Sequence, residues 1–235
     1  MTPGTLFLIP VPLSPDGAET IPVSVQKTIE PMRIFIVEND RTARRMLRRM
    51  GFTADFSEVT LITIDKHSKI DPKPAINSLM SGHDVGLLSE SGCPAVADPG
   101  SPFIREAHRN SIPVVPLTGP SSVLLALMAS GFNGQSFVFH GYLPIKPNAR
   151  LNSIRKLESD SSANNITQIF IETPYRNNEI VKAVINNCRP ETYFCVASDL
   201  TSPNESIISQ PVSAWKRMQL PDFHKIPAVF LIYAG

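Results

Sequence analysis

The chain has 235 residues, of which 42% are hydrophobic, and a formal net charge of +1. This is enough apolar sequence for one large or two small domains, and the near-neutral charge excludes a protein that is basic over its whole surface. Three irregularly spaced cysteines predict free thiols in a reducing cytoplasm, and no cluster has the spacing of metal ligands. The opening residues do not resemble a signal peptide and no apolar run approaches the ~20 residues of a membrane span, so we expect no membrane contact.

The first half of the chain alternates short apolar runs with amphipathic segments, which is typical of an α/β domain with a mostly parallel sheet. The expected strands are Thr5–Val11, Arg33–Val37, Val59–Ile64, Val85–Leu88 and Pro113–Leu117. The expected helices are Asp40–Met50, Pro72–Ser81, Pro102–Asn110 and Pro120–Ser130.

The second half alternates in the same way, but two of its strands follow each other after a short turn, which predicts a partly antiparallel, mixed sheet. The expected strands are Phe137–Tyr142, Gln168–Glu172, Thr192–Leu200, Glu205–Gln210 and Ala228–Tyr233. The expected helices are Asn148–Glu158, Pro174–Asn187 and Pro211–Met218, with a loop at Ser159–Asn165. We therefore predict an N-terminal α/β domain over residues 1–117 and a C-terminal mixed α/β domain over residues 118–235.

Two turn-rich segments, Ser89–Pro102 and Leu117–Ser122, each follow an expected strand. In open α/β sheets, ligands bind outside the carboxyl ends of the strands. The sequence has no P-loop, no dinucleotide-binding GxGxxG after its first strand and no GxSxG, so these classes of nucleotide-binding and hydrolytic site are disfavoured. Such loops, without a nucleophile or a metal site, fit a protein that mainly positions two substrates.

The expected helix Asp40–Met50 has an arginine-only polar face opposite an apolar face. Five like charges on one face repel one another unless an anion is near, and the planar guanidinium suits phosphate. A charge run is also commonly just a solvated surface, so both interpretations stay open. The arginines are Arg41, Arg44, Arg45, Arg48 and Arg49.

Acidic side chains end two of the expected strands of the second half. Glu172 is followed by Thr173, and Asp199 is followed soon after by Thr201. Both lie at the expected ligand-facing edge, although an acidic residue there can simply cap the next helix. Asp98 likewise precedes a proline and a glycine, and it can either face a ligand or form an Asx-turn.

Several sequence blocks resemble one known family in their order along the chain. They are FLIPVPL, IVENDRTARRMLRRMGF, LLSESGCPAVADPGSPFIREAHRNSIPVVPLTGPSSVLLALMASGF, FVFHGYLP, IFIETPYR and ASDLTSPNESI. The chain resembles the tetrapyrrole methylase superfamily, the class III S-adenosylmethionine methyltransferases. The likeness is greatest to those members that methylate a cytidine 2'-hydroxyl of small-subunit ribosomal RNA.

The resemblance implies two α/β domains with S-adenosylmethionine in the cleft between them, and a homodimer. It implies that the cofactor contacts Pro10, Ser89, Glu90, Cys93, Pro94, Asp98, Ser121, Ser122, Glu172, Thr173, Leu200, Pro227, Ala228 and Val229. For transfer to a ribose hydroxyl, Glu38 and Asp98 are the expected catalytic bases, with Glu172 a third candidate. Ribosomal RNA of the small subunit is the implied partner, and Arg41, Arg44, Arg45 and Arg48 are the expected RNA contacts.

The chain departs from the family pattern at four places. Pro12–Gly17 replaces a glycine-bearing loop close to PIGNL, and ESGCP stands where DAGTP is usual. Glu38–Asn39 keeps one carboxylate of an acidic pair, and Lys225–Ala228 lacks a Gly-Glu pair. Two alternatives therefore stay open: a methyltransferase for a small molecule of the tetrapyrrole type, and a non-catalytic module that binds the cofactor or RNA.

Overall fold

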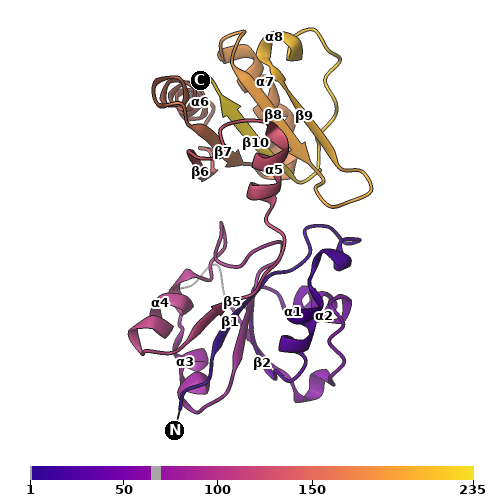
Figure 1. Ribbon diagram of the computed structural model, residues 1–235, viewed down its shortest axis with the longest axis vertical. Helices are drawn as coiled ribbons and strands as arrows, with labels where there is room; N and C mark the ends of the chain where they lie inside the picture. The colour runs from indigo at the N-terminus through magenta and orange to yellow at the C-terminus, as the bar shows by residue number, and fades with distance from the viewer. Residues whose placement is uncertain (1, 65–69) are drawn as a thin grey trace. The chain divides into compact units, whose positions relative to one another are not determined.

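The computed structural model describes residues 2–64 and 70–235 and divides into two compact units, Met1–Ser121 and Ser122–Gly235 (Figure 1). Each unit contains its own sheet and its own hydrophobic core. Among the described residues, we find no helix long and apolar enough to cross a membrane.

The first unit is built on a sheet whose described strands all run parallel in the order β3-β2-β4-β1-β5. The strands are β1 (Leu6–Ile9), β2 (Ile34–Val37), β3 (Thr60–Thr63), β4 (Val85–Leu88) and β5 (Val114–Pro116). Helices or turns of helix connect them: η1 (Ala18–Thr20), α1 (Val23–Ile29), α2 (Asp40–Arg49), η2 (Phe56–Glu58), α3 (Lys73–Met80) and α4 (Ser101–Arg109). A parallel sheet requires such crossover connections, as the alternating sequence predicted.

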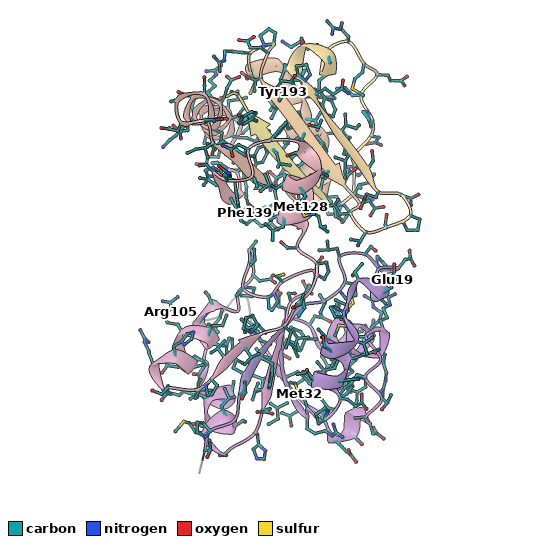
Figure 2. All side chains as sticks on the ribbon, in the orientation of Figure 1. Glu19, Met32, Arg105, Met128, Phe139 and Tyr193 are labelled. Atoms are coloured by element: carbon teal, nitrogen blue, oxygen red, sulfur yellow. The ribbon has the colours of Figure 1, made fainter. Side chains whose placement is uncertain are left out.

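Helices cover both faces of this sheet. Figure 1 shows α1 and α2 on one side and α3 and α4 on the other. Successive residues of β2 serve the two faces, because Phe35 packs with α1 and α2 while Ile36 packs with α3 and α4. Met32, labelled in Figure 2, completes the core on the α1 side.

The second unit holds a mixed sheet in the order β6-β7-β10-β8-β9, in which β6 and β7 are parallel and the other neighbours antiparallel. The strands are β6 (Phe137–Tyr142), β7 (Thr167–Ile171), β8 (Tyr193–Ser198), β9 (Ser206–Pro211) and β10 (Ala228–Tyr233). The helices are α5 (Ser122–Ser130), α6 (Pro147–Asn164), η3 (Pro174–Arg176), α7 (Asn177–Asn187) and α8 (Val212–Trp215). The predicted fold class, a parallel first sheet and a mixed second sheet, is confirmed.

The core of the second unit is centred on stacked aromatic rings. Phe230 stacks on Phe170 with ring centroids 5.5 Å apart and on Phe194 at 6.2 Å. The buried indole of Trp215 tilts against Phe194 at 5.4 Å and donates a hydrogen bond to its carbonyl oxygen at 2.9 Å. Apolar residues of α6 and α7, Ile154 among them, close this core.

One local expectation was wrong, and one helix was missed. Of the loop expected at Ser159–Asn165, all but Asn165 belongs to α6, because Ser161 is fully buried and accepts a hydrogen bond from the backbone N–H of Ala234 at 2.9 Å. Serine and aspartate favour turns only when no tertiary contact outweighs that preference. Helix α1 was not expected at all, although Val25 and Ile29 bury its inner face.

Candidate functional site

The carboxyl ends of the parallel strands bring several predicted site residues to one edge of the first sheet. Pro10 follows β1, Glu38 follows β2 and Ser89 follows β4. Pro10 and Ser89 are buried, whereas Glu38 and the nearby Asp98 are half-buried. Each residue is partly exposed, but one carboxylate oxygen of each, Oε1 of Glu38 and Oδ2 of Asp98, is buried.

Three loops at this edge are tied together. Val11 and Gly92 exchange backbone hydrogen bonds of 2.9 and 3.1 Å, and the hydroxyl of Ser89 donates to the Gly92 carbonyl oxygen at 2.8 Å. The thiol of Cys93 lies 3.5 Å from the carbonyl oxygen of Pro120, so the β4 and β5 loops also meet. Together these contacts make one connected surface from three segments distant in sequence.

Gly119 approaches the first of these loops so closely that a side chain has no room. A Cβ atom at this position would lie 2.3 Å from Cγ and 2.4 Å from Cβ of Pro10. Because a Cβ atom essentially never lies within 3.0 Å of another heavy atom, any side chain at position 119 would force one of the two loops to move. Glycine is therefore required here by the close approach of Pro10 and not by its backbone angles.

The loop after β4 also holds an unusual backbone. Gly92 (φ 72°), Ala95 (φ 65°) and Ala97 (φ 60°) lie in the left-handed region. For alanine this costs on the order of 1–3 kcal/mol and persists only where surrounding contacts impose it. Such strain concentrates at functional loops, which supports the prediction of a ligand site over Ser89–Pro102.

A second group of predicted residues meets at one edge of the second sheet. Strand β10 runs antiparallel to both β7 and β8, with Val229 opposite Ile171 and Ala228 opposite Ser198. The start of β10 therefore lies between the carboxyl ends of β7 and β8, and Asp199 donates its backbone N–H to Pro227 at 2.9 Å. This edge gathers Glu172, Thr173, Leu200, Pro227, Ala228 and Val229.

Glu172 is the most buried carboxylate at this edge, with a side chain that is 0% exposed. Its Oε1 accepts hydrogen bonds from the backbone N–H of Thr173 at 2.6 Å and from Nη2 of Arg176 at 2.5 Å. The bond from Arg176 raises the pKa of that guanidinium. Its Oε2 is buried without a hydrogen-bond partner in the part of the chain that the structure describes. A buried acceptor of this kind calls for a donor, and a bound ligand supplies one.

The remaining predicted cofactor residues lie in the loop after β4 or at the connection between the two units. Glu90 is exposed, Cys93 is half-buried and Pro94 is buried. Ser121 ends the first unit and Ser122 begins α5 in the second, and both are half-buried. The position of a cofactor between the two units stays a prediction.

The arginine helix is amphipathic as predicted, with Ala43, Met46 and Leu47 buried. Two of its arginines have partners that sequence reasoning missed. Arg44 forms an ion pair with Asp40 and lies 5.0 Å from the ring centroid of Phe56. The guanidinium carbon of Arg48 lies 4.5 Å from the centroid of the same Phe56 ring.

The guanidinium of Arg48 also donates to the carbonyl oxygen of Phe52 at 2.7 Å. Arg41 and Arg45 are exposed, and Arg41 stands at the end of α2 that follows β2, nearest the candidate site. These two are the better candidates for contact with an anion. Phe56 offered no signal of its role in the sequence because it lies outside the helix.

The family model described as Tetrapyrrole (Corrin/Porphyrin) Methylases matches residues 8–214. The chain belongs to this family. Membership confirms the prediction of an S-adenosylmethionine-dependent methyltransferase with two α/β domains.

Two tetrapyrrole methylase relatives are similar over most of the chain, and both are named ribosomal RNA small subunit methyltransferase I. The protein of Vibrio cholerae serotype O1 is 28% identical over 88% of this chain and 69% of its own length. That of Xylella fastidiosa is 27% identical over 98% and 81% respectively.

Solved structures share the fold at lower identity. The methyltransferase CobJ superposes with a TM-score of 0.63 at 18% identity, covering 99% of this chain and 94% of that one. Uroporphyrin-III C-methyl transferase from Thermus thermophilus, complexed with S-adenyl homocysteine, gives a TM-score of 0.57 at 14% identity, covering 98% and 97%.

Proposed function

We propose that this protein transfers a methyl group from S-adenosylmethionine to a ribose 2'-hydroxyl of small-subunit ribosomal RNA. The observation that carries the proposal is the likeness, over nearly the whole chain, to relatives named for ribosomal RNA of the small subunit. The solved structures named for uroporphyrin and cobalamin chemistry are similar at only 14% and 15% identity, which shows the fold alone.

The residues at the two sheet edges fit the cofactor. S-adenosylmethionine carries hydrogen-bond donors on its ammonium group, its adenine amino group and its ribose hydroxyls, together with an activated methyl group. The buried Oε2 of Glu172, an acceptor without a hydrogen-bond partner among the described residues, would accept one such donor. The loops at Pro10, Ser89 and Cys93 offer backbone hydrogen-bonding groups beside small side chains. The absence of a side chain at Gly119 lets its loop pack closely against Pro10.

When bound, the sulfonium supplies a methyl carbon with a good leaving group. The chain has to align the acceptor oxygen with that carbon and remove the hydroxyl proton, as the new C–O bond forms and the C–S bond breaks. Glu38 and Asp98 remain our candidates for this base, a proposal supported by their positions in the loops after β2 and β4. Glu172 already binds Arg176 and the Thr173 N–H, so we assign it to holding the cofactor.

The decisive experiment incubates the purified protein, labelled S-adenosylmethionine and small ribosomal subunits that lack the modification. We expect label in the RNA, in a dinucleotide that resists alkaline hydrolysis because its 2'-oxygen is methylated. Asp98→Asn and Glu38→Gln variants that keep cofactor affinity should lose the label to different extents, which identifies the base. Label that enters a tetrapyrrole precursor, and not RNA, contradicts the proposal.

We also propose that the protein acts in the cytoplasm as a homodimer, as the family resemblance implies. Size-exclusion chromatography coupled to light scattering measures the molar mass of the protein in solution directly. We expect twice the mass of one chain, whereas a monomer at micromolar concentration rejects the dimer.

A further inference from the structure

An exposed aromatic side chain stands beside the buried Glu172 site. Tyr175 belongs to η3, three residues after Glu172, and is 68% exposed. The ring of His224 lies edge-on to it, with centroids 6.0 Å apart and planes at 72°. Nζ of Lys225 lies 5.9 Å from the centroid of the same ring. We call these three side chains the Tyr175 cluster.

Buried hydrogen bonds hold this cluster in place. Asn177, fully buried at the start of α7, donates through Nδ2 to the carbonyl oxygen of Ile226 at 2.6 Å. Asn178 accepts from the backbone N–H of Phe223 at 2.9 Å and donates to Asp222 at 2.7 Å. These bonds clamp the loop before β10 against α7.

A further bond joins the two segments of the cluster directly, because the backbone N–H of Lys225 donates to the carbonyl oxygen of Pro174 at 3.0 Å. Lys225 has a left-handed backbone (φ 63°), which a lysine adopts only where its surroundings impose it. The loop is therefore fixed in a conformation that places a cation beside the tyrosine ring. A side chain that is already ordered loses little entropy when it binds a partner.

The cluster lies at the edge of the second sheet that also gathers the predicted cofactor contacts. Tyr175 follows the carboxyl end of β7, and Lys225 precedes Pro227 at the start of β10, the strand paired with β7. An exposed ring with an imidazole and an ammonium group beside it combines the two chemistries that bind unpaired RNA. Bases stack on aromatic faces, and cations attract the phosphates.

We propose that the Tyr175 cluster is a stacking platform for an unpaired base of the RNA substrate, with Lys225 contacting its backbone. The inference rests on the proposed function and deepens it. It assigns recognition of single-stranded RNA to the second unit, in addition to the arginine helix of the first. Unpaired RNA suits such a platform because its bases can leave the stack and lie on an aromatic ring, whereas bases within a regular helix remain stacked on one another.

The test measures binding separately from methylation. The probe is a fluorescent, unstructured 12-residue oligocytidine, titrated by anisotropy at fixed salt. Tyr175→Ala should weaken binding about 10- to 100-fold, the range of one lost base stack, while Tyr175→Phe keeps the ring and stays close to the wild-type affinity. Lys225→Gln should reduce the salt dependence by about one counterion.

Tyr193→Ala is the matched control. Tyr193 is an exposed aromatic residue of the same unit (47% exposed; Figure 2), but it begins β8 and so lies at the opposite edge of the sheet. Its replacement should leave RNA affinity unchanged. Calorimetry with S-adenosylmethionine should give the same affinity for Tyr175→Ala and the wild type, because the cluster contacts RNA and not the cofactor.

The inference is overturned if Tyr175→Ala and Tyr193→Ala bind the oligonucleotide equally, if the wild type does not bind it, or if Tyr175→Ala loses the cofactor as well. None of these outcomes tests whether the protein methylates ribosomal subunits, because they concern only binding to the oligonucleotide and the cofactor. A wild type that methylates no RNA contradicts the proposed function, whereas a Tyr175-dependent affinity for the oligonucleotide still supports the platform.

Discussion

Arg176 donates a hydrogen bond of 2.5 Å to the buried carboxylate of Glu172, four residues before it in the chain. The side chain of Arg176 is 26% exposed and that of Glu172 is 0% exposed. The ion pair therefore has its carboxylate in the interior of the second unit and its guanidinium partly at the surface. Buried ion pairs add little net stability, but removing one partner leaves an uncompensated charge.

We therefore predict that Arg176→Met lowers the free energy of unfolding by about 3–5 kcal/mol. The double variant Glu172→Gln/Arg176→Met should recover a large part of this loss, because no buried charge remains. Urea unfolding of the second-unit transition measures both. Equal losses in the single and double variants contradict a coupled pair.

Close approach at Gly119 gives a prediction for the first unit. Gly119→Ala places a Cβ atom against Pro10 and must move one loop, so we expect a lower melting temperature and roughly tenfold weaker binding of S-adenosylmethionine, about 1.4 kcal/mol. Calorimetry measures the affinity.

Gly134→Ala is the control for this substitution, because a Cβ atom there meets nothing within 4 Å. It should change neither the melting temperature nor the cofactor affinity. Unchanged cofactor affinity in Gly119→Ala means that the Pro10 loop takes no part in binding.

The strands were the most predictable part of this fold. β4, β6 and β10 have the predicted bounds, because short apolar runs between turn residues leave few other structures. The polar end of α6 was missed, since its burial depends on a contact between Ser161 and Ala234, 73 residues apart.

The positions of the candidate site residues at the sheet edges were predictable to the same extent, whereas their roles stay predictions. Residues that follow strands were located from the sequence, because strand ends in one sheet gather at one edge. The clamp from Asn177 to Ile226 was not, as it joins positions 49 residues apart through a single side chain. Likewise, Phe56 beneath Arg44 and Arg48 shows that a like-charged helix face can be stabilised by an aromatic ring from a later segment.

Four of the five arginines of α2 form two pairs that differ in their contacts, Arg44 and Arg48 beside Phe56 and Arg41 and Arg45 exposed. Arg41→Glu/Arg45→Glu should leave the free energy of unfolding unchanged and weaken binding to ribosomal subunits, with a smaller dependence on salt. Arg48→Ala should instead cost about 1 kcal/mol of stability, because it loses Phe52 and Phe56. If the Arg41→Glu/Arg45→Glu variant methylates RNA as fully as the wild type, these two arginines do not contribute to RNA binding.

The cysteines differ in accessibility, which gives a chemical test of the cofactor loop. Burial raises the pKa of Cys188 and of Cys195 to about 12, so both stay neutral and unreactive at pH 8. Cys93 is half-buried, and burial raises its pKa too, so we expect one slow thiol in the native protein and three after unfolding. S-adenosylmethionine should slow the reaction of Cys93 further, and the rate of labelling by a thiol-reactive dye measures this. An unchanged labelling rate in the presence of the cofactor contradicts a contact between Cys93 and the cofactor.

The same burial predicts how stability depends on alkaline pH. The thiol of Cys195 has a pKa raised by burial from 9.0 to about 12 in the folded protein. Between these values the unfolded chain binds fewer protons than the folded one, so this group's contribution is fully present below pH 9.0 and is lost as the pH rises toward 12. The free energy of unfolding of Cys195→Ala should therefore fall less steeply than that of the wild type between about pH 9 and pH 11. Urea unfolding at a series of pH values compares the two slopes, and identical slopes contradict a buried neutral thiol.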